Sequence, residues 1–493
     1  MANTLITLPL EIVHHILKYV DPKDLASVAR TCWVLQRCVV RDRLLWREVW
    51  GMCFDTPNGG IGKQEGNEFD FERELKEFVR VRGILTNERS SVEEKVTRLP
   101  TIASFTSKLL QTASAKDSKN MAILRQWFDE KRDKEKRDNI EAFLCQSTTF
   151  ARSRIRSEEE RSGGVSTAVG FESRQASAKL HVHYGTPIFC PRRTKYNQAY
   201  PYAISMVYDL RNYTEETLWG PYLADGQASV DWEKMEAVMI VLGWNLRVFM
   251  EQSSGGGVFG PRSIWREPWV GASPGSYDAG KCGVPQALPE GVVDYYEIQG
   301  TWLRVVCFLD FHDLFAYNFT SESDPPPSEP RPALNTNEAI RLISMELRVV
   351  RCEPPGPNDG QELPVVFFEG TAKSMHMQWD PNANSRLRGS VRLTREGEVR
   401  WQSVSVYGGE ERWASEGIQV GGLRSARGVL GHWFDKDHDI HGPAGPTAFW
   451  KVNDHLDDGE DYDSEEEDDD WTEDPEEILE AIASIVGFQA DLG

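Results

Sequence analysis

The first fifty residues constrain the fold most, because they read as three short helices with more apolar side chains than so small a unit can bury. Pro9 suits a first helical position, and Leu8, Ile12 and Ile16 recur at helical spacing. A unit of about 45 residues is rarely stable alone without a metal, disulfides or a partner. No metal-ligand spacing occurs in this stretch, so its surplus apolar surface indicates a docking partner.

The pattern also predicts where these helices begin. Pro22 disfavours helical dihedrals at Asp21, which can then cap a second helix. That helix is expected to carry Leu25, Val28, Ala29, Cys32 and Leu35 along one face. A third helix is expected to start near Asp42.

These residues resemble an F-box, the module by which substrate receptors of ubiquitin ligases bind the Skp-type adaptor of a cullin complex. The resemblance runs from Thr4 to Trp50, through Leu8-Pro9, Glu11-Ile12, Ile16-Leu17, Asp24-Leu25, Val28, Cys32, Leu35 and Leu45-Trp46. It implies that nine residues contact the adaptor: Leu8, Pro9, Ile12, Ile16, Leu25, Val28, Cys32, Leu35 and Trp46. The alternative is an ordinary three-helix cap packed on the following domain.

The charge of the chain is concentrated at one end. Of the net charge of −22, 16 acidic residues lie between Asp454 and Glu477, which leaves −6 for the remainder. This balance argues against nucleic acid as a partner, because phosphate binding needs a cationic surface. Residues 454–493 are therefore expected to form a disordered acidic tail, with a short amphipathic helix at 476–488.

Cysteine usage and hydropathy indicate the compartment. The eight cysteines are scattered without a CxxC pair, as expected of reduced thiols, and neither a secretion signal nor a membrane-length apolar run is evident. We therefore expect a cytoplasmic or nuclear protein, or one found in both compartments, with protein partners and no membrane contact.

The rest of the chain predicts an α+β architecture. The expected divisions are an F-box at 1–52, a helical linker at 53–178, and a β-rich substrate-recognition domain at 179–453 interrupted by one helix at Asp231–Met250. Within that domain, short alternating segments at 387–452 are separated by glycine-containing turns. These segments predict a mostly antiparallel meander, either a barrel or a sandwich.

The β region resembles the C-terminal domain of many filamentous-fungal F-box proteins. The resemblance is carried by LWGPY (218–222), VDWEKMEAVMIVLG (230–243), GTWLRVVCFLDF (300–311), LRGSVRLTREGEVRW (387–401) and the segments between 411 and 451. A lipocalin-like barrel is the form we expect from it.

Two candidate sites fall in this region. Arg412, Arg424 and Trp433 are candidate target-binding residues if the barrel has an open mouth. His432, Asp435 and His441 could hold a divalent metal, but a polar turn whose side chains bond their own backbone is the favoured interpretation. His181 and His183 are expected on one side of a strand, in a structural role.

The resemblance as a whole implies a non-catalytic, cofactor-free substrate receptor of an SCF-type cullin–RING ubiquitin ligase. It would bind the Skp-type adaptor through the F-box and an unknown target protein through the β domain. The alternatives are a ligand- or metal-binding β-barrel that carries an F-box, and a scaffold that works outside degradation.

Overall fold

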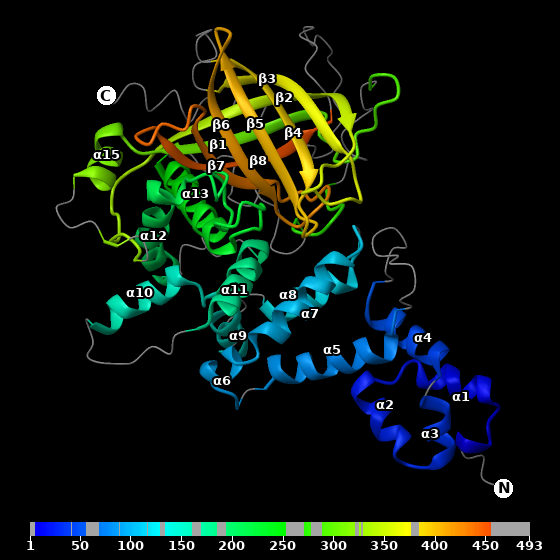
Figure 1. Cartoon of the computed structure of the whole chain (residues 1–493). Helices are drawn as coiled ribbons and strands as arrows, with labels where there is room; N and C mark the ends of the chain where they lie inside the picture. The colour runs from blue at the N-terminus through cyan, green and yellow to red at the C-terminus, as the bar shows by residue number, and fades with distance from the viewer. Residues whose placement is uncertain are drawn as a thin grey trace, which may run out of the picture. The chain divides into compact units, whose positions relative to one another are not determined.

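The computed structural model of the chain divides into two compact units, Met1–Cys145 and Gln146–Gly493 (Figure 1). The residues that the structure describes are 5–40, 42–55, 69–87, 89–115, 117–128, 134–159, 169–184, 194–252, 271–277, 288–320, 325–326, 329–375 and 384–454. The predicted acidic tail lies outside them, except for Asp454.

The first unit is entirely helical in its described part. Its elements are η1 (Leu5–Thr7), α1 (Leu10–Leu17), α2 (Pro22–Ala29), α3 (Trp33–Val39), α4 (Arg43–Cys53), α5 (Phe71–Leu85), α6 (Val92–Val96), α7 (Leu99–Gln111), α8 (Lys119–Phe128) and α9 (Lys134–Leu144).

The predicted cap at Asp21 and the predicted helix start near Asp42 are both confirmed. The Asp21 side chain accepts a hydrogen bond from Lys23 N at the start of α2, and Asp42 accepts one from Leu45 N at the start of α4. The predicted extent of the second helix, which included Cys32 and Leu35, was wrong. The chain leaves helical geometry at Cys32, which has extended backbone angles and precedes α3, so Leu35 belongs to a separate helix.

The helices after residue 53 do not form a spacer, because they share a core with the first four. Trp50 and Phe54 of the α4 end stack at 4.3 Å, and Phe54 meets Phe78 of α5 at 4.8 Å. Phe78 in turn stacks on Trp127 of α8 at 6.0 Å. The division between units falls at Cys145, inside the predicted 53–178 linker.

The second unit combines helices with eight strands. Its elements are α10 (Thr148–Glu159), α11 (Phe171–Tyr184), α12 (Thr194–Val207), η3 (Leu210–Asn212), α13 (Trp232–Gln252), β1 (Gly300–Phe308), α15 (Phe311–Phe319), β2 (Ala339–Glu353), β3 (Val365–Ser374), β4 (Ser385–Leu393), β5 (Val399–Tyr407), β6 (Glu410–Gln419), β7 (Val429–Asp435) and β8 (Ala444–Asn453).

The prediction that strands begin near Lys179 was wrong, because α11 and α12 occupy 171–184 and 194–207 and the first described strand begins at Gly300. Helix α11 is buried around most of its last two turns, so it lacks the one-sided periodicity that marks a helix in sequence. His181 and His183 lie on this helix, where His181 Nδ1 is 2.6 Å from Glu236 Oε1. The predicted helix at 231–250 is confirmed as α13, with Asp231 accepting from Glu233 N.

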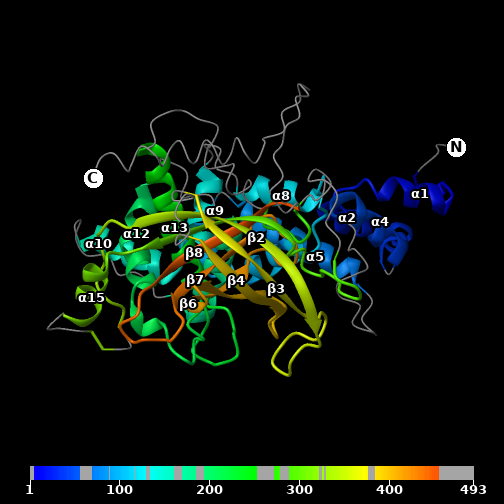
Figure 2. The same cartoon turned by 90° about the horizontal axis from the view of Figure 1, so that it is seen from above.

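The eight strands form a closed barrel in sequence order, with every neighbouring pair antiparallel and β8 paired with β1 (Figures 1 and 2). The predicted α+β class is thus confirmed, and of the two predicted arrangements the barrel is the observed one. Eight strands in an up-and-down closed order are also the arrangement of lipocalins.

Aromatic rings fill one part of the barrel interior. Trp401 lies 5.0 Å from Trp302, 5.7 Å from Phe368 and 5.4 Å from Phe449, between ring centroids. Since these residues come from β5, β1, β3 and β8, they can meet only inside the barrel. The strand residues that alternate with them therefore face outward.

Among the described residues, helices cover one side of the outer surface of the barrel. Figures 1 and 2 show α12 and α13 together against one side, where α13 packs on β7, β8 and β1. Glu338, just before β2, accepts hydrogen bonds from Tyr200 of α12 (2.9 Å), Tyr208 (2.5 Å) and Asn245 of α13 (2.6 Å). In Figure 1 no helix lies over the outer face of β3–β6. Among the described residues, no helix is both long and apolar enough for a membrane span.

Candidate functional site

The N-terminal helices expose a line of large apolar side chains. Leu8, Ile12 and Ile16 follow each other at a spacing of four residues and are 36%, 48% and 41% exposed. On the opposite side of α1, Val13 and Leu17 are buried. The spacing places Ile12 and Ile16 on one face of α1, and Leu8 lies just before the helix begins.

Other large apolar side chains in the same stretch of the chain are also exposed: Leu5, Leu10, Tyr19, Trp33, Val40, Leu44 and Met52. Monomeric proteins seldom leave so many large apolar groups in water within fifty residues. Polar side-chain contacts hold helix α1, because His14 Nδ1 is 3.2 Å from Asp42 and Lys18 Nζ is 3.8 Å from Glu48. The exposed line is therefore displayed by a fixed helix.

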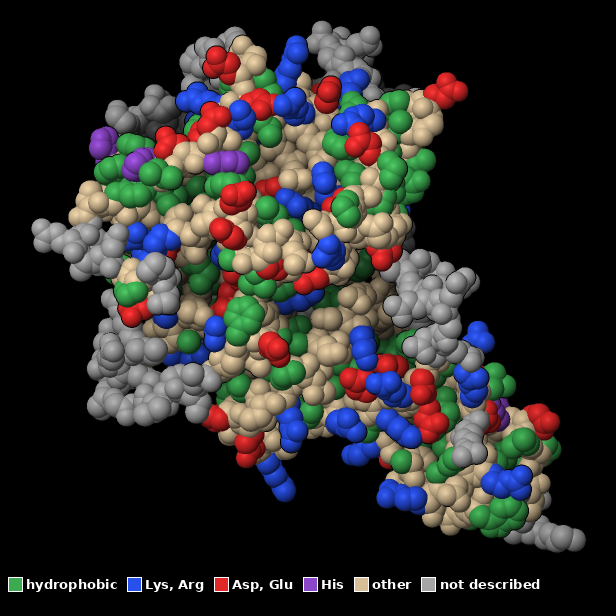
Figure 3. Space-filling model, in the orientation of Figure 1, with side chains coloured by type: hydrophobic (Ala, Val, Ile, Leu, Met, Phe, Trp, Pro, Cys, Tyr) green, Lys and Arg blue, Asp and Glu red, His purple; other side chains and the backbone are tan. Residues whose placement is uncertain are grey.

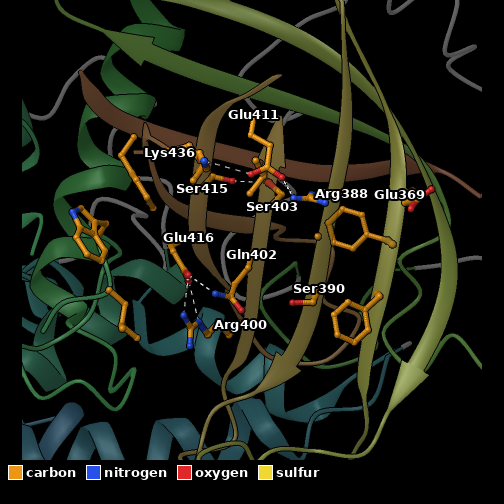
Figure 4. A pocket seen from close by; sticks show the side chains of 18 of the residues that line it. Glu369, Arg388, Ser390, Arg400, Gln402, Ser403, Glu411, Ser415, Glu416 and Lys436 are labelled. Carbon is orange, nitrogen blue, oxygen red and sulfur yellow. Dashed lines mark hydrogen bonds and ion pairs between the residues drawn. The ribbon is translucent and has the colours of Figure 1, made fainter. Parts of the chain in front are cut away.

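A groove of about 690 Å³ lies on the uncovered outer face of β3–β6 (Figure 4). Its lining mixes cations, carboxylates and apolar side chains, and Figure 3 shows both charge types over this side of the molecule. The charged residues of the lining are Arg351, Glu369, Arg388, Arg400, Glu411, Glu416 and Lys436, and its aromatic residues include Trp219, Phe367 and Phe434.

Glu416 organises one end of the groove. Its carboxylate accepts hydrogen bonds from Arg400 Nη2 (2.8 Å), Gln402 Nε2 (2.6 Å) and Tyr222 Oη (3.0 Å). Burial by itself lowers the pKa of Arg400, but the adjacent Glu416 carboxylate outweighs it and the pKa is raised. The pair is therefore ionised and fixed.

The other charges of the groove are partly paired. Glu411 forms ion pairs with Arg388 and, at 3.8 Å, with Lys436 (Figure 4). The guanidinium of Arg351 lies 3.6 Å from the ring centre of Phe367. Glu369 is exposed and, among the described residues, has no ion-pair partner.

The segment LWGPY forms one wall of the groove through an unusual backbone. Leu218 and Trp219 both have positive φ angles, 51° and 55°, which bulky residues rarely adopt. The turn stacks Trp219 on His438 with 3.6 Å between ring centroids. A side chain on Gly220 would overlap the Tyr222 ring, at 2.4 Å. Strain of this kind gathers at functional sites, so it favours a binding role for this wall.

Comparison with known proteins bears on the N-terminal helices. Residues 5–50 match the family model described as F-box-like. The chain carries an F-box-like domain. Neither the curated proteins nor the solved structures include a match to the chain. F-box domains in general bind Skp-type adaptors of cullin complexes, and proteins that carry them are generally non-catalytic.

The nine predicted adaptor-contact residues separate into three groups in the F-box-like domain. Leu8, Pro9, Ile12 and Ile16 are exposed, and Val28 and Cys32 are half-buried. Leu25, Leu35 and Trp46 are buried in the core of the first unit. Those three hold the helices in place, so a direct adaptor contact is available only to the other six.

Of the three candidate target-binding residues, Arg412 and Trp433 both lie beside Trp413, whereas Arg424 lies beyond the other end of β6. Arg412 is exposed and lies over the Trp413 ring at 5.1 Å. Arg424 pairs with Glu297 at 3.0 Å in the β6–β7 connection. Trp433 faces the barrel interior and donates from Nε1 to Cys307 O at 3.0 Å.

The candidate metal ligands are also separated. His432 packs on Tyr213 at 5.0 Å, and burial lowers its pKa to about 3. His441 packs on Phe319 at 4.7 Å. Within the described ranges no group of three His, Cys, Asp or Glu residues could hold a metal ion. Asp439 N donates to Asp435 and His441 N donates to Asp439, as in a polar turn.

The sequence reasoning missed the groove. Arg400 and Gln402 alternate with inward Val399 and Trp401, and this alternation could have identified an outward polar strip on β5. No local signal links Tyr222 to Glu416, because 194 residues separate them.

Proposed function

We propose that this chain is the substrate receptor of an SCF-type cullin–RING ubiquitin ligase. The single observation that carries the proposal is the exposure of Leu8, just before α1, and of Ile12 and Ile16 on α1 of the F-box-like domain. An adaptor would cover this apolar surface, and the gain from removing it from water would drive the association.

The proposed mechanism is proximity. A target bound by the second unit would be held near the ubiquitin-conjugating enzyme, which raises the effective concentration of its lysines. In this scheme no side chain of the chain performs chemistry, and no cofactor is needed.

The outer groove of β3–β6 is the proposed target-binding surface. It combines a pre-formed polar network around Glu416 with aromatic walls and the carboxylate of Glu369, which has no ion-pair partner in the described part of the chain. Such a combination suits recognition of a protein segment with both apolar and charged groups. The domain division that we propose is an F-box-like domain merged with the helices up to Cys145, and a helix-backed barrel as the receptor part.

The adaptor contact is tested by changing Ile12 and Ile16 to glutamate together in the full chain. Two charges in the centre of an apolar interface should abolish co-purification with a Skp-type adaptor, while circular dichroism and the unfolding temperature stay unchanged. Phe311→Glu is the matched control, because it places the same charge on an exposed apolar residue of α15 in the other unit. Undiminished adaptor binding by the double variant would refute the proposal.

A further inference from the structure

One inward-facing residue of the barrel is a cation. Arg304 follows Trp302 on the inner side of β1, and its register partner is the core residue Phe449 on β8. It is only 7% exposed. It therefore lies next to the aromatic layer of the barrel core.

Arg304 has little within the protein to balance its charge. Its Nε donates to Thr447 Oγ1 at 2.9 Å, and that hydroxyl donates onward to Val305 O. Among the described residues, no carboxylate lies within ion-pair distance of its guanidinium. In contrast, the buried Arg331 pairs with Asp209 and Arg400 pairs with Glu416. Burial lowers the pKa of Arg304 to about 10, so the group is still charged at neutral pH.

A buried charge without a partner is strongly unfavourable, and native proteins normally pair such a charge. The guanidinium also presents several donors in a plane, of which the described residues engage one. Both facts indicate that a second, external group completes this site.

The inner surface beyond Arg304 is polar and aromatic. Ser403 and Ser415 share a hydrogen bond of 2.7 Å on the inner side of β5 and β6. The hydroxyl of Ser374, on β3, is buried and has no hydrogen-bond partner among the described residues. Trp413 meets Trp433 edge-to-face at 5.4 Å. The two tryptophans and Ser403 are only half-buried although they face inward, so this part of the barrel is less filled than the aromatic layer.

We propose that the barrel interior binds a small organic carboxylate, whose charged group pairs with Arg304 and whose apolar body packs on Trp413 and Trp433. An eight-stranded barrel is wide enough to hold one small ligand. Planar, two-bond pairing with a carboxylate is the interaction for which arginine is best suited. Arg304, Trp413 and Trp433 are not part of the groove lining, and the proposed site does not depend on adaptor binding.

The test measures the unfolding temperature and the tryptophan fluorescence of the full-length protein with a panel of aliphatic and aromatic monocarboxylates, including benzoate. Benzamide serves as the neutral match of benzoate, and inorganic phosphate as the non-organic anion. At least one carboxylate should raise the unfolding temperature and change the fluorescence in a saturable manner, whereas benzamide should not. No response to any carboxylate, or a response to phosphate alone, would overturn the proposal.

Three variants locate the site. Arg304→Met should lose the carboxylate response, and without ligand it should unfold at or above the wild-type temperature, because an unpaired charge has been removed. Arg386→Met, which changes an exposed arginine of β4 in the same barrel, should respond as the wild type does. An Arg304→Met protein that keeps the full response, or is much less stable than the wild type, would refute the assignment. Arg304→Lys keeps the charge and should weaken binding at least tenfold; unchanged affinity would count against it.

Discussion

Arg82 of α5 donates to both carboxylate oxygens of Asp21, at 2.9 and 2.6 Å, while Asp21 also caps α2. One side chain thus joins the F-box-like domain to the helix that follows it. The hydrogen bond from Arg82 is the main reason why the pKa of Asp21 is lowered.

Asp21→Ala should destabilise α2 more than Arg82→Met does, because only the first removes the cap. We expect about 1 kcal/mol from the cap, and less than about 1 kcal/mol from the ion pair, whose side chains are partly exposed. Hydrogen exchange of the α2 amides in the full chain measures both effects. Equal effects of the two variants would contradict the assignment of the cap.

The stability of the second unit should fall in mild acid. Burial is the main cause that lowers the pKa of His183 to about 4 and that of His432 to about 3, whereas an unfolded histidine titrates near 6.5. The folded state thus favours the neutral rings, so their contribution is complete above pH 6.5 and is lost as the pH falls toward 3. For each ring the loss approaches about 2 kcal/mol between pH 6.5 and 5.

Urea unfolding at several pH values tests this trend. His432→Leu should reduce the slope between pH 6.5 and 5, while His312→Ala, which changes an exposed histidine, should not. A slope unaffected by the His432 substitution would argue against a buried neutral ring.

The contribution of Glu338 to the stability of the second unit should change with pH in the opposite direction, falling as the pH rises. Burial raises its pKa to about 7 despite the hydrogen bonds from Tyr208, Asn245 and Tyr200. The folded state therefore holds a proton that the unfolded chain releases near 4.5. This contribution is complete below pH 4.5 and declines as the pH rises to 7. Glu338→Gln should remove the decline, so the difference between variant and wild type in unfolding free energy should change across this window. A difference independent of pH would contradict the raised pKa.

The role of the groove in target binding can be tested without destabilising the barrel by changing Glu369, which has no ion-pair partner among the described residues. Glu369→Lys should change which proteins are captured when the ligase is stalled and its complexes are analysed by mass spectrometry, with stability unchanged within about 0.5 kcal/mol. Glu396→Lys, on the exposed β4–β5 turn, is the control. Identical captured proteins for both variants would exclude a contribution of Glu369 to target recognition.

Glu416→Ala, in contrast, should destabilise the barrel by about 3 kcal/mol, because it leaves the largely buried Arg400 without its partner. Thermal unfolding measures the loss. An Arg400→Met, Glu416→Met double variant should recover part of it, and a double variant less stable than Glu416→Ala would contradict this account of the pair.

The sequence predicted structural features that depend on residues close together in the chain, and it missed features that depend on residues far apart. Asp21 and Asp42 mark helix starts through neighbours two or three residues away, so both were predictable. Val399 and Trp401 alternate with Arg400 and Gln402, so the strands near them were predictable too. The helices at 171–207 could not be predicted from a local pattern, because a helix that is buried on several sides lacks the apolar periodicity of an amphipathic helix. The lone charge of Arg304 looked ordinary in a strand, since its isolation appears only when eight strands close around it.

Closure of the barrel also limits how a target can be recognised. Because β8 pairs with β1, the eight strands have no free edge, and a peptide cannot join them as an added strand through backbone hydrogen bonds. Selectivity must therefore come from side chains. The receptor could acquire a new target through a few substitutions on the outward positions of β3–β6, while the hydrogen-bonded framework beneath them stays the same.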